Sequence, residues 1–184
     1  MAGKSWVDAN YRFIAAYQEI NARIAQRQQA LGLYVTLVVS ILAALVALKP
    51  GATGGQIPAE WLVLGFPVAS TCLAFLNYKA ERAITNLRRF LSTLERLDKE
   101  VHGLPSYNTD PHWAAGANQA RRFHDFAAAV LVIGGNGLGL AAGLSIYPER
   151  IGAHTPILGL ALVLSLGSVL VLLLNPKWSF RPEA

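Results

Sequence analysis

Four arginines are the side chains in this sequence whose clustering best suits binding chemistry. They are Arg88, Arg89, Arg121 and Arg122. Guanidinium groups that lie close together bind phosphate oxygens in pairs, so one hypothesis is that this cluster contacts an anion, either a nucleotide or an anionic lipid head group. The alternative is that these arginines only mark a membrane surface, with their stems on apolar neighbours and their charged ends in water.

Catalysis and metal binding are not expected from the remaining titratable residues. His124 and Asp125 are adjacent on a predicted helix and point in different directions, so they make a poor acid and base pair. His102, His112 and His124 lack the spacing of a metal site. The single cysteine, Cys72, excludes an internal disulfide. We therefore expect no enzyme activity, no metal and no cofactor.

A ladder of glycines is the most specific packing signal. Gly135, Gly139 and Gly143 are spaced by four residues, which gives a helix a smooth groove that another backbone can approach closely. Three alternatives are open: contact with a neighbouring span of the same chain, a subunit interface, or a pore-lining face. The amide of Asn136, beside the ladder, needs a partner, so it either bonds to another helix or faces a conducting axis.

Four apolar stretches without Asp, Glu, Lys or Arg contain or adjoin these residues. They cover residues 31–48, 61–78, 126–147 and 157–174. About 20 apolar residues of helix cross the ~30 Å hydrocarbon layer with every backbone polar group bonded internally. The sequence thus predicts an all-α, polytopic membrane protein with four transmembrane helices in a single membrane domain, residues 1–184. Uncharged spans argue against a proton relay or ion-coupled transport. Pro67, near the middle of the second span, predicts a kink.

The basic residues predict the orientation of the spans. All of them except Lys49 and Arg150 lie in residues 1–30, 79–125 and 175–184. The positive-inside rule therefore places both termini in the cytoplasm and the protein in the cell's inner (plasma) membrane. The net charge of +5 is then explained by anionic lipid, and nucleic acid is not an expected partner.

Two spans are expected to extend beyond the bilayer as helices. Residues 1–30 form an amphipathic helix that continues into the first span, and residues 79–103 continue the second. The two extensions should pair as an antiparallel cytoplasmic hairpin. Residues 104–125 form a linker and a third helix, which begins with Asp110 as its cap and Pro111 in its first turn. The stripe expected to pair the hairpin is Ala83, Leu87, Phe90, Leu94, Leu97 and Val101.

The first part of the chain, residues 1–103, resembles in arrangement the SLATT-type membrane domains of bacteria. A leading amphipathic helix and two spans are followed by a charged helix that begins Lys79-Ala80-Glu81-Arg82. The resemblance implies a pore-forming effector of nucleotide-signalled antiviral defence. The last two spans depart from the pattern, and no functional residue is carried over from it.

Two functions follow from these observations as hypotheses. The first is a homo-oligomeric pore or ion-conducting effector, gated through its cytoplasmic helices by a nucleotide or a protein. The second is a noncatalytic accessory or scaffold subunit that uses the same helices to dock a cytoplasmic protein. The glycine ladder, Asn136 and Pro67 motivate the first hypothesis. The absence of polar spans and catalytic groups motivates the second.

Overall fold

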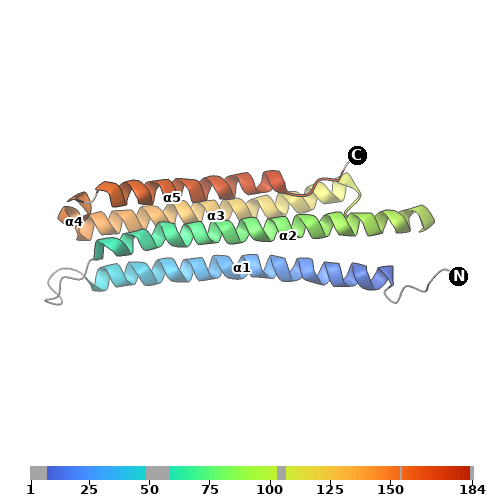
Figure 1. The fold of residues 1–184 in the computed structure, drawn as a ribbon, viewed down its shortest axis with the longest axis horizontal. Helices are drawn as coiled ribbons and strands as arrows, with labels where there is room; N and C mark the ends of the chain where they lie inside the picture. Colours follow the sequence, from blue (N-terminus) through green and yellow to red (C-terminus); the bar gives the residue numbers. More distant parts are fainter. Residues whose placement is uncertain (1–7, 49–58, 103–106, 154, 183–184) are drawn as a thin grey trace.

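Four long helices run side by side along the molecule in the computed structural model (Figure 1). The structure describes residues 8–48, 59–102, 107–153 and 155–182. Its long helices are α1 (Ala9–Ala47), α2 (Gly65–His102), α3 (Pro111–Ile146) and α5 (Thr155–Leu174). The short elements are the 3-10 helices η1 (Ala59–Leu64) and η2 (Asn175–Trp178) and the helix α4 (Pro148–Ala153). No strand occurs within these ranges, so the predicted all-α class is confirmed.

Each of the four predicted spans is found in a helix long and apolar enough to cross a membrane. In α1 and α2 the helix continues without a break past the apolar stretch, as predicted. The 39 residues of α1 measure about 58 Å at 1.5 Å per residue, roughly twice the hydrocarbon thickness. The assignment of one end to the cytoplasm is a prediction from the charges.

The charged extensions of the helices lie at one end of the bundle. The first turn of α1, the last turn of α2 and the first turn of α3 all point to this end (Figure 1). We call this end, residues 9–30, 79–102, 107–125 and 175–182, the polar half. The rest of the bundle is the apolar half. Helix α3 begins as predicted, because the Asp110 side chain accepts a 2.8 Å hydrogen bond from the backbone N–H of His112.

The extensions of α1 and α2 pack together in the polar half, as predicted. Their contact is a core cluster of Ala16, Ile20, Ile84 and Leu91. The predicted stripe on α2 is displaced, however, since Phe90 is 43% exposed. The buried face of α2 also includes charged residues, and the predicted apolar stripe contains none of them. Of the residues predicted for the stripe, Leu97 and Val101 lie outside the described side chains.

The prediction of a kink in the middle of the second span is wrong. Residues 61–64 belong to η1, and the α-helix begins only at Gly65. Pro67 therefore occupies the first turn of α2. Backbone N–H groups in a first helical turn have no partner within the helix, so a proline at this place removes no helical hydrogen bond. The chain changes from 3-10 to α-helix just before Pro67.

The glycine ladder of α3 packs against side chains of the same chain. A Cβ atom on Gly135 would come within 2.6 Å of the Tyr34 hydroxyl oxygen, and one on Gly139 within 2.5 Å of the Phe66 ring. At Gly143 a Cβ would meet Val63 at 2.8 Å. The ladder is thus filled by α1, α2 and η1. Of the three alternatives drawn from the sequence, this packing favours contact between spans of one chain.

Gly139→Ala should destabilise the bundle, because the added methyl group overlaps the buried Phe66 ring. Overpacking of this kind costs about 1–3 kcal/mol. The matched control is Gly137→Ala, where a Cβ would meet no atom within 4 Å. Thermal unfolding in detergent should therefore show a lowered midpoint for Gly139→Ala and an unchanged one for Gly137→Ala. Equal midpoints for the two variants would contradict the packing described.

Candidate anion-binding site

A buried ion cluster joins three helices at the level where the apolar half begins. The Arg27 guanidinium of α1 donates to Glu81 of α2 over 2.9 Å and also to Asp125 of α3. All three side chains are at least 95% buried. Because an ion removed from water is costly unless it is paired, both carboxylates are stabilised by the guanidinium between them, and Glu81 also by Arg121 at 3.8 Å.

The end of the fourth long helix is tied to the same cluster. The Asn175 amide donates a 3.1 Å hydrogen bond to Asp125, and the Ser179 hydroxyl donates a 2.7 Å bond to Glu81. Both donors follow α5, in and just after η2. The cluster therefore fixes the relative height of all four long helices at one level of the bundle.

Arg88 lies further into the polar half, and its side chain is held by neutral groups. Its Nε donates to the Asn108 side-chain oxygen over 3.1 Å, and its Nη1 donates to the Asn118 side-chain oxygen over 3.0 Å. Its guanidinium carbon lies 5.5 Å from the centre of the Phe180 ring, a cation–π contact. Arg121 donates to the same Asn118 oxygen. Two arginines thus converge on one uncharged acceptor.

Burial lowers the pKa of several titratable side chains in this region. Burial, assisted by the charge of Arg121, lowers the pKa of Arg88 to about 10. Burial also lowers the pKa of Arg121. For His124, burial and then the positive charge of Arg27 lower the pKa below its usual value of about 6.5. These groups lie outside the apolar stretches.

A cavity of about 650 Å³ opens between α1, α2 and α3 in the polar half. Its basic wall is formed by Arg27, Arg88 and Arg121, and its apolar wall includes Phe13, Tyr17 and Ile20. Guanidinium nitrogens of all three arginines are buried without a hydrogen-bond partner among the described residues. Unpartnered buried donors are rare in folded proteins, so these nitrogens are suited to donate to an acceptor that enters the cavity.

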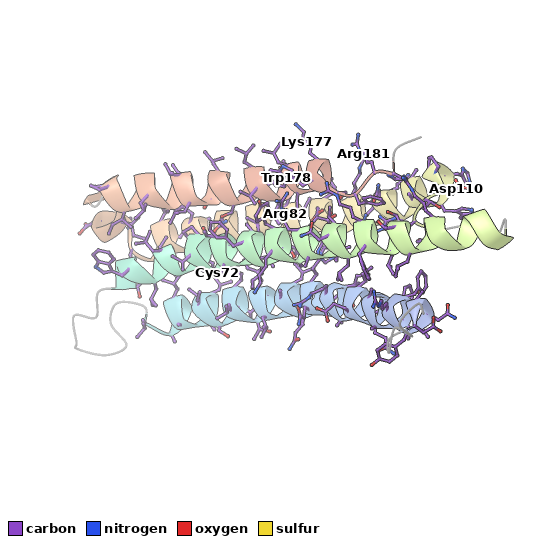
Figure 2. All side chains as sticks on the ribbon, turned by 45° about the vertical axis from the view of Figure 1, so that its right-hand side comes forward. Cys72, Arg82, Asp110, Lys177, Trp178 and Arg181 are labelled. Atoms are coloured by element: carbon purple, nitrogen blue, oxygen red, sulfur yellow. The ribbon has the colours of Figure 1, made fainter. Side chains whose placement is uncertain are left out.

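The structure separates the four arginines that the sequence suggested as one cluster. Arg88 and Arg121 lie in the wall of the cavity. Their neighbours Arg89 and Arg122 are exposed and do not line it. Other basic residues of the polar half are also exposed, for example Lys177, which Figure 2 shows projecting away from the bundle. Only one arginine of each predicted pair is therefore placed to contact an enclosed ligand.

Asn136 and the glycine ladder lie far along α3 from this cavity, in the apolar half. The Asn136 amide donates a 2.9 Å hydrogen bond to the Ser70 hydroxyl of α2, and Ser70 donates in turn to Tyr34 of α1. This chain of bonds joins three helices, in agreement with the first of the two roles suggested for Asn136. The side chain also borders a small cavity of about 190 Å³ with Pro67 in its wall.

Sequence reasoning missed the residues at the centre of the site, namely Arg27, Glu81 and Asn118, and it used Asp125 only to reject it as a base. One feature of the sequence does indicate that Asp125 and Asn118 are buried. Counting back from Gly139 in steps of seven gives Val132, Asp125 and Asn118, all buried on one face of α3. A helix face that continues from glycines into polar residues predicts that those polar residues are also buried.

No group of three or more His, Cys, Asp or Glu side chains suited to a metal ion occurs in the part of the chain that the structure describes. No family model, curated protein or solved structure matches this chain. The function of the site has therefore to be inferred from its own geometry and charges.

Arg27→Met should be strongly destabilising, because it leaves Asp125 buried without a directly bonded cation and Glu81 with only the longer 3.8 Å ion pair to Arg121. Breaking one partner out of a buried ion pair typically costs about 3–5 kcal/mol. Arg23→Met is the matched control, since Arg23 contacts Glu19 and Gln26 on its own helix at a partly exposed position, and such an ion pair is worth about 0–1 kcal/mol. The measurement is the midpoint of thermal or denaturant unfolding in detergent.

Removing all three charges separates this effect from a loss of packing. The triple variant Arg27→Met, Glu81→Gln and Asp125→Asn should be more stable than Arg27→Met alone, because no unpaired charge stays buried. If the single variant and the Arg23→Met control unfolded at the same midpoint, the cluster would not have the role assigned to it.

Proposed function

We propose that this protein is a noncatalytic multi-pass effector of the plasma membrane that assembles as a homo-oligomer through α1, conducts ions between its copies, and is controlled through its cytoplasmic polar half. The observation that carries the proposal is the outward face of α1. From Ala22 to Ala47 this face has mostly small side chains where lipid-facing helices usually have large ones. Its small residues are Ala22, Ala25, Gly32, Thr36, Ser40, Ala43 and Ala47.

The spacing of three and four residues places these side chains on one stripe, and all of them are exposed. The stripe is opposite the face that carries Ile20, Arg27 and Tyr34, which are buried in the bundle. A Cβ atom on Gly32 would meet no atom within 4 Å, so this position leaves open space. A stripe of small residues lets the backbone of a second helix approach closely, which is how helices associate in lipid.

In the polar half, too, this face of α1 is left uncovered by the residues that the structure describes. Tyr11 is 69% exposed and Ile14 is 56% exposed, although both lie well outside the apolar stretch. Large apolar side chains grouped on a surface in water mark contacts with another protein. A second copy of α1, related by an axis along the membrane normal, would cover both parts of the face at once.

Control through the polar half follows from the attachment of α1. This helix contributes Phe13, Tyr17 and Arg27 to the cavity wall, and its inward face is tied to α2 and α3 by the ion cluster. A ligand that enters the cavity must contact α1, whose other face is the proposed interface. Occupancy of the cavity therefore acts on the helix that would join the copies.

A conducting path in this proposal lies between copies rather than inside one chain. The glycine ladder and Asn136 are used for packing within the bundle, so the interior of one chain offers no open path for ions. The alternative function, a scaffold subunit, uses the same exposed residues Tyr11 and Ile14 to bind a helix of a different protein. The two functions differ in the partner of α1, which is a second copy of the chain in the pore and a helix of a different protein in the scaffold.

Assembly can be tested by enlarging the outward face of α1. In mild detergent, native mass spectrometry should find the wild type as an oligomer, and the variant Gly32→Leu with Ser40→Leu as a monomer. Gly134→Leu is the matched control, because Gly134 also faces open space but lies on α3. A monomeric wild type at all protein concentrations would rule out the homo-oligomer, and a stoichiometric complex with another protein would favour the scaffold.

Conduction can be tested in planar bilayers with the same variants. Purified wild-type protein should give discrete current steps, and the Gly32→Leu, Ser40→Leu variant should give none at equal protein density. Gly134→Leu should conduct like the wild type. An oligomer that stays silent across voltages and under every ligand tested would remove conduction from the proposal and leave the assembly.

A further inference from the structure

We infer that the cavity between α1, α2 and α3 binds a soluble organic anion, with its phosphate or carboxylate group between Arg88 and Arg121 and its apolar or aromatic body against Phe13 and Tyr17. This inference goes beyond the proposed function. It concerns the ligand of one chain and holds whether or not the chain forms an oligomer or conducts ions.

The first argument is that neither arginine donates a hydrogen bond to a carboxylate in the described part of the chain, although Glu95 also lines the cavity. The side chain of Arg88 is only 4% exposed, yet its hydrogen-bond acceptors are the neutral amides of Asn108 and Asn118. Arg121 donates to the same Asn118 oxygen, so two like charges share one weak acceptor. An anionic oxygen at this place would accept stronger, charge-assisted hydrogen bonds and would relieve the repulsion between the guanidinium groups.

The carboxylates nearby are already engaged elsewhere. Glu81 and Asp125 bind Arg27, and Arg121 comes only within 3.8 Å of Glu81. Glu95 accepts hydrogen bonds from the backbone and side-chain nitrogens of Asn108, over 2.8 and 2.7 Å. The Arg88 Nη2 and Arg121 Nε atoms have no hydrogen-bond partner in the described part of the chain. A built, buried and incompletely satisfied set of donors is what an anion site requires.

The second argument is the order in which the basic and the aromatic walls of the cavity follow one another away from the apolar half. Arg88 lies seven residues beyond Glu81 of the ion cluster, about 10 Å into the polar half, while Phe13 lies fourteen residues before Arg27, about 21 Å into it at 1.5 Å per residue. The aromatic wall is therefore about 10 Å further from the apolar half than Arg88. A bilayer lipid has the opposite polarity, with its head group in water and its chains toward the membrane. A ligand with its anionic end toward the membrane must enter from the water side, and it is therefore soluble.

The third argument is the size and composition of the walls. A cavity of about 650 Å³ lies within the usual range of about 300–1,000 Å³ for sites of small organic molecules. Phe13, Tyr17 and Ile20 offer an apolar surface, and the side chains of Asn21 and Gln28 add hydrogen-bonding groups beside it. A bare inorganic ion would leave this apolar wall in contact with water. An organic body would cover it.

The experiment measures ligand-induced stabilisation of the full chain in lipid nanodiscs with 1-naphthyl phosphate as the probe. Saturating probe should raise the unfolding midpoint of the wild type by more than about 3 °C, and inorganic phosphate should raise it less. Arg88→Gln should lose most of this shift. Arg89→Gln, one residue away and exposed, is the matched control and should keep it. Phe13→Ala should reduce the response to naphthyl phosphate but not the response to inorganic phosphate.

Varying the lipid composition of the nanodiscs tests whether the bound anion is instead a lipid head group of the membrane. The shift should be equal in nanodiscs of phosphatidylcholine alone and in nanodiscs that also contain phosphatidylglycerol. A shift that needs phosphatidylglycerol, an equal loss in Arg88→Gln and Arg89→Gln, or no shift in the wild type would each overturn the inference. If Arg88→Gln fails to fold, Arg121→Gln with Arg122→Gln as its control gives the same comparison.

Discussion

The rest of the structure depends on one buried guanidinium, that of Arg27. It donates hydrogen bonds to two carboxylates, Glu81 and Asp125, that are removed from water where the apolar half of the bundle ends. Hydrophobic contacts between helices in lipid are weakly directional, because lipid chains are as apolar as the side chains they replace. A buried ion cluster, in contrast, tolerates little sliding or rotation, since each displaced charge would lose its partner. The cluster thus fixes the register that apolar packing leaves loose.

The two halves of the bundle, on either side of the ion cluster, have different properties. In the apolar half, small residues of α3 allow α1, α2 and η1 to pack closely, and polar groups such as Asn136 and Ser70 bond within the chain. In the polar half, α1 and α3 enclose a cavity with α2. Arg88 and Arg121 line this space, and each has a buried donor without a partner among the described residues. One half is therefore closely packed, and the other is suited to receive a ligand.

The fold was largely predictable from the sequence, and the site was predictable only in part. Uncharged stretches identify spans because hydrocarbon excludes charge, and the start of α3 follows from Asp110 and Pro111. The site required knowing which charged residues turn inward. A charged residue is usually solvated, so Arg27 and Glu81 were not singled out, and Arg89 and Arg122 were ranked equal to Arg88 and Arg121. Side-chain direction depends on helix rotation, and in α2 that rotation is set by packing against three other helices rather than by its own apolar stripe.

The ion cluster also bears on the order in which the chain is made. The first two long helices bring one base and one acid, Arg27 and Glu81, which pair directly, and the third brings Arg121 and Asp125 together. Each half of the protein is therefore charge-balanced at this level before the other arrives. During synthesis the α1 and α2 hairpin can lie in the membrane with its buried charge already neutralised. The arrival of α3 then adds Asp125 as a second acceptor for Arg27 and places Arg121 near Glu81, without adding net charge.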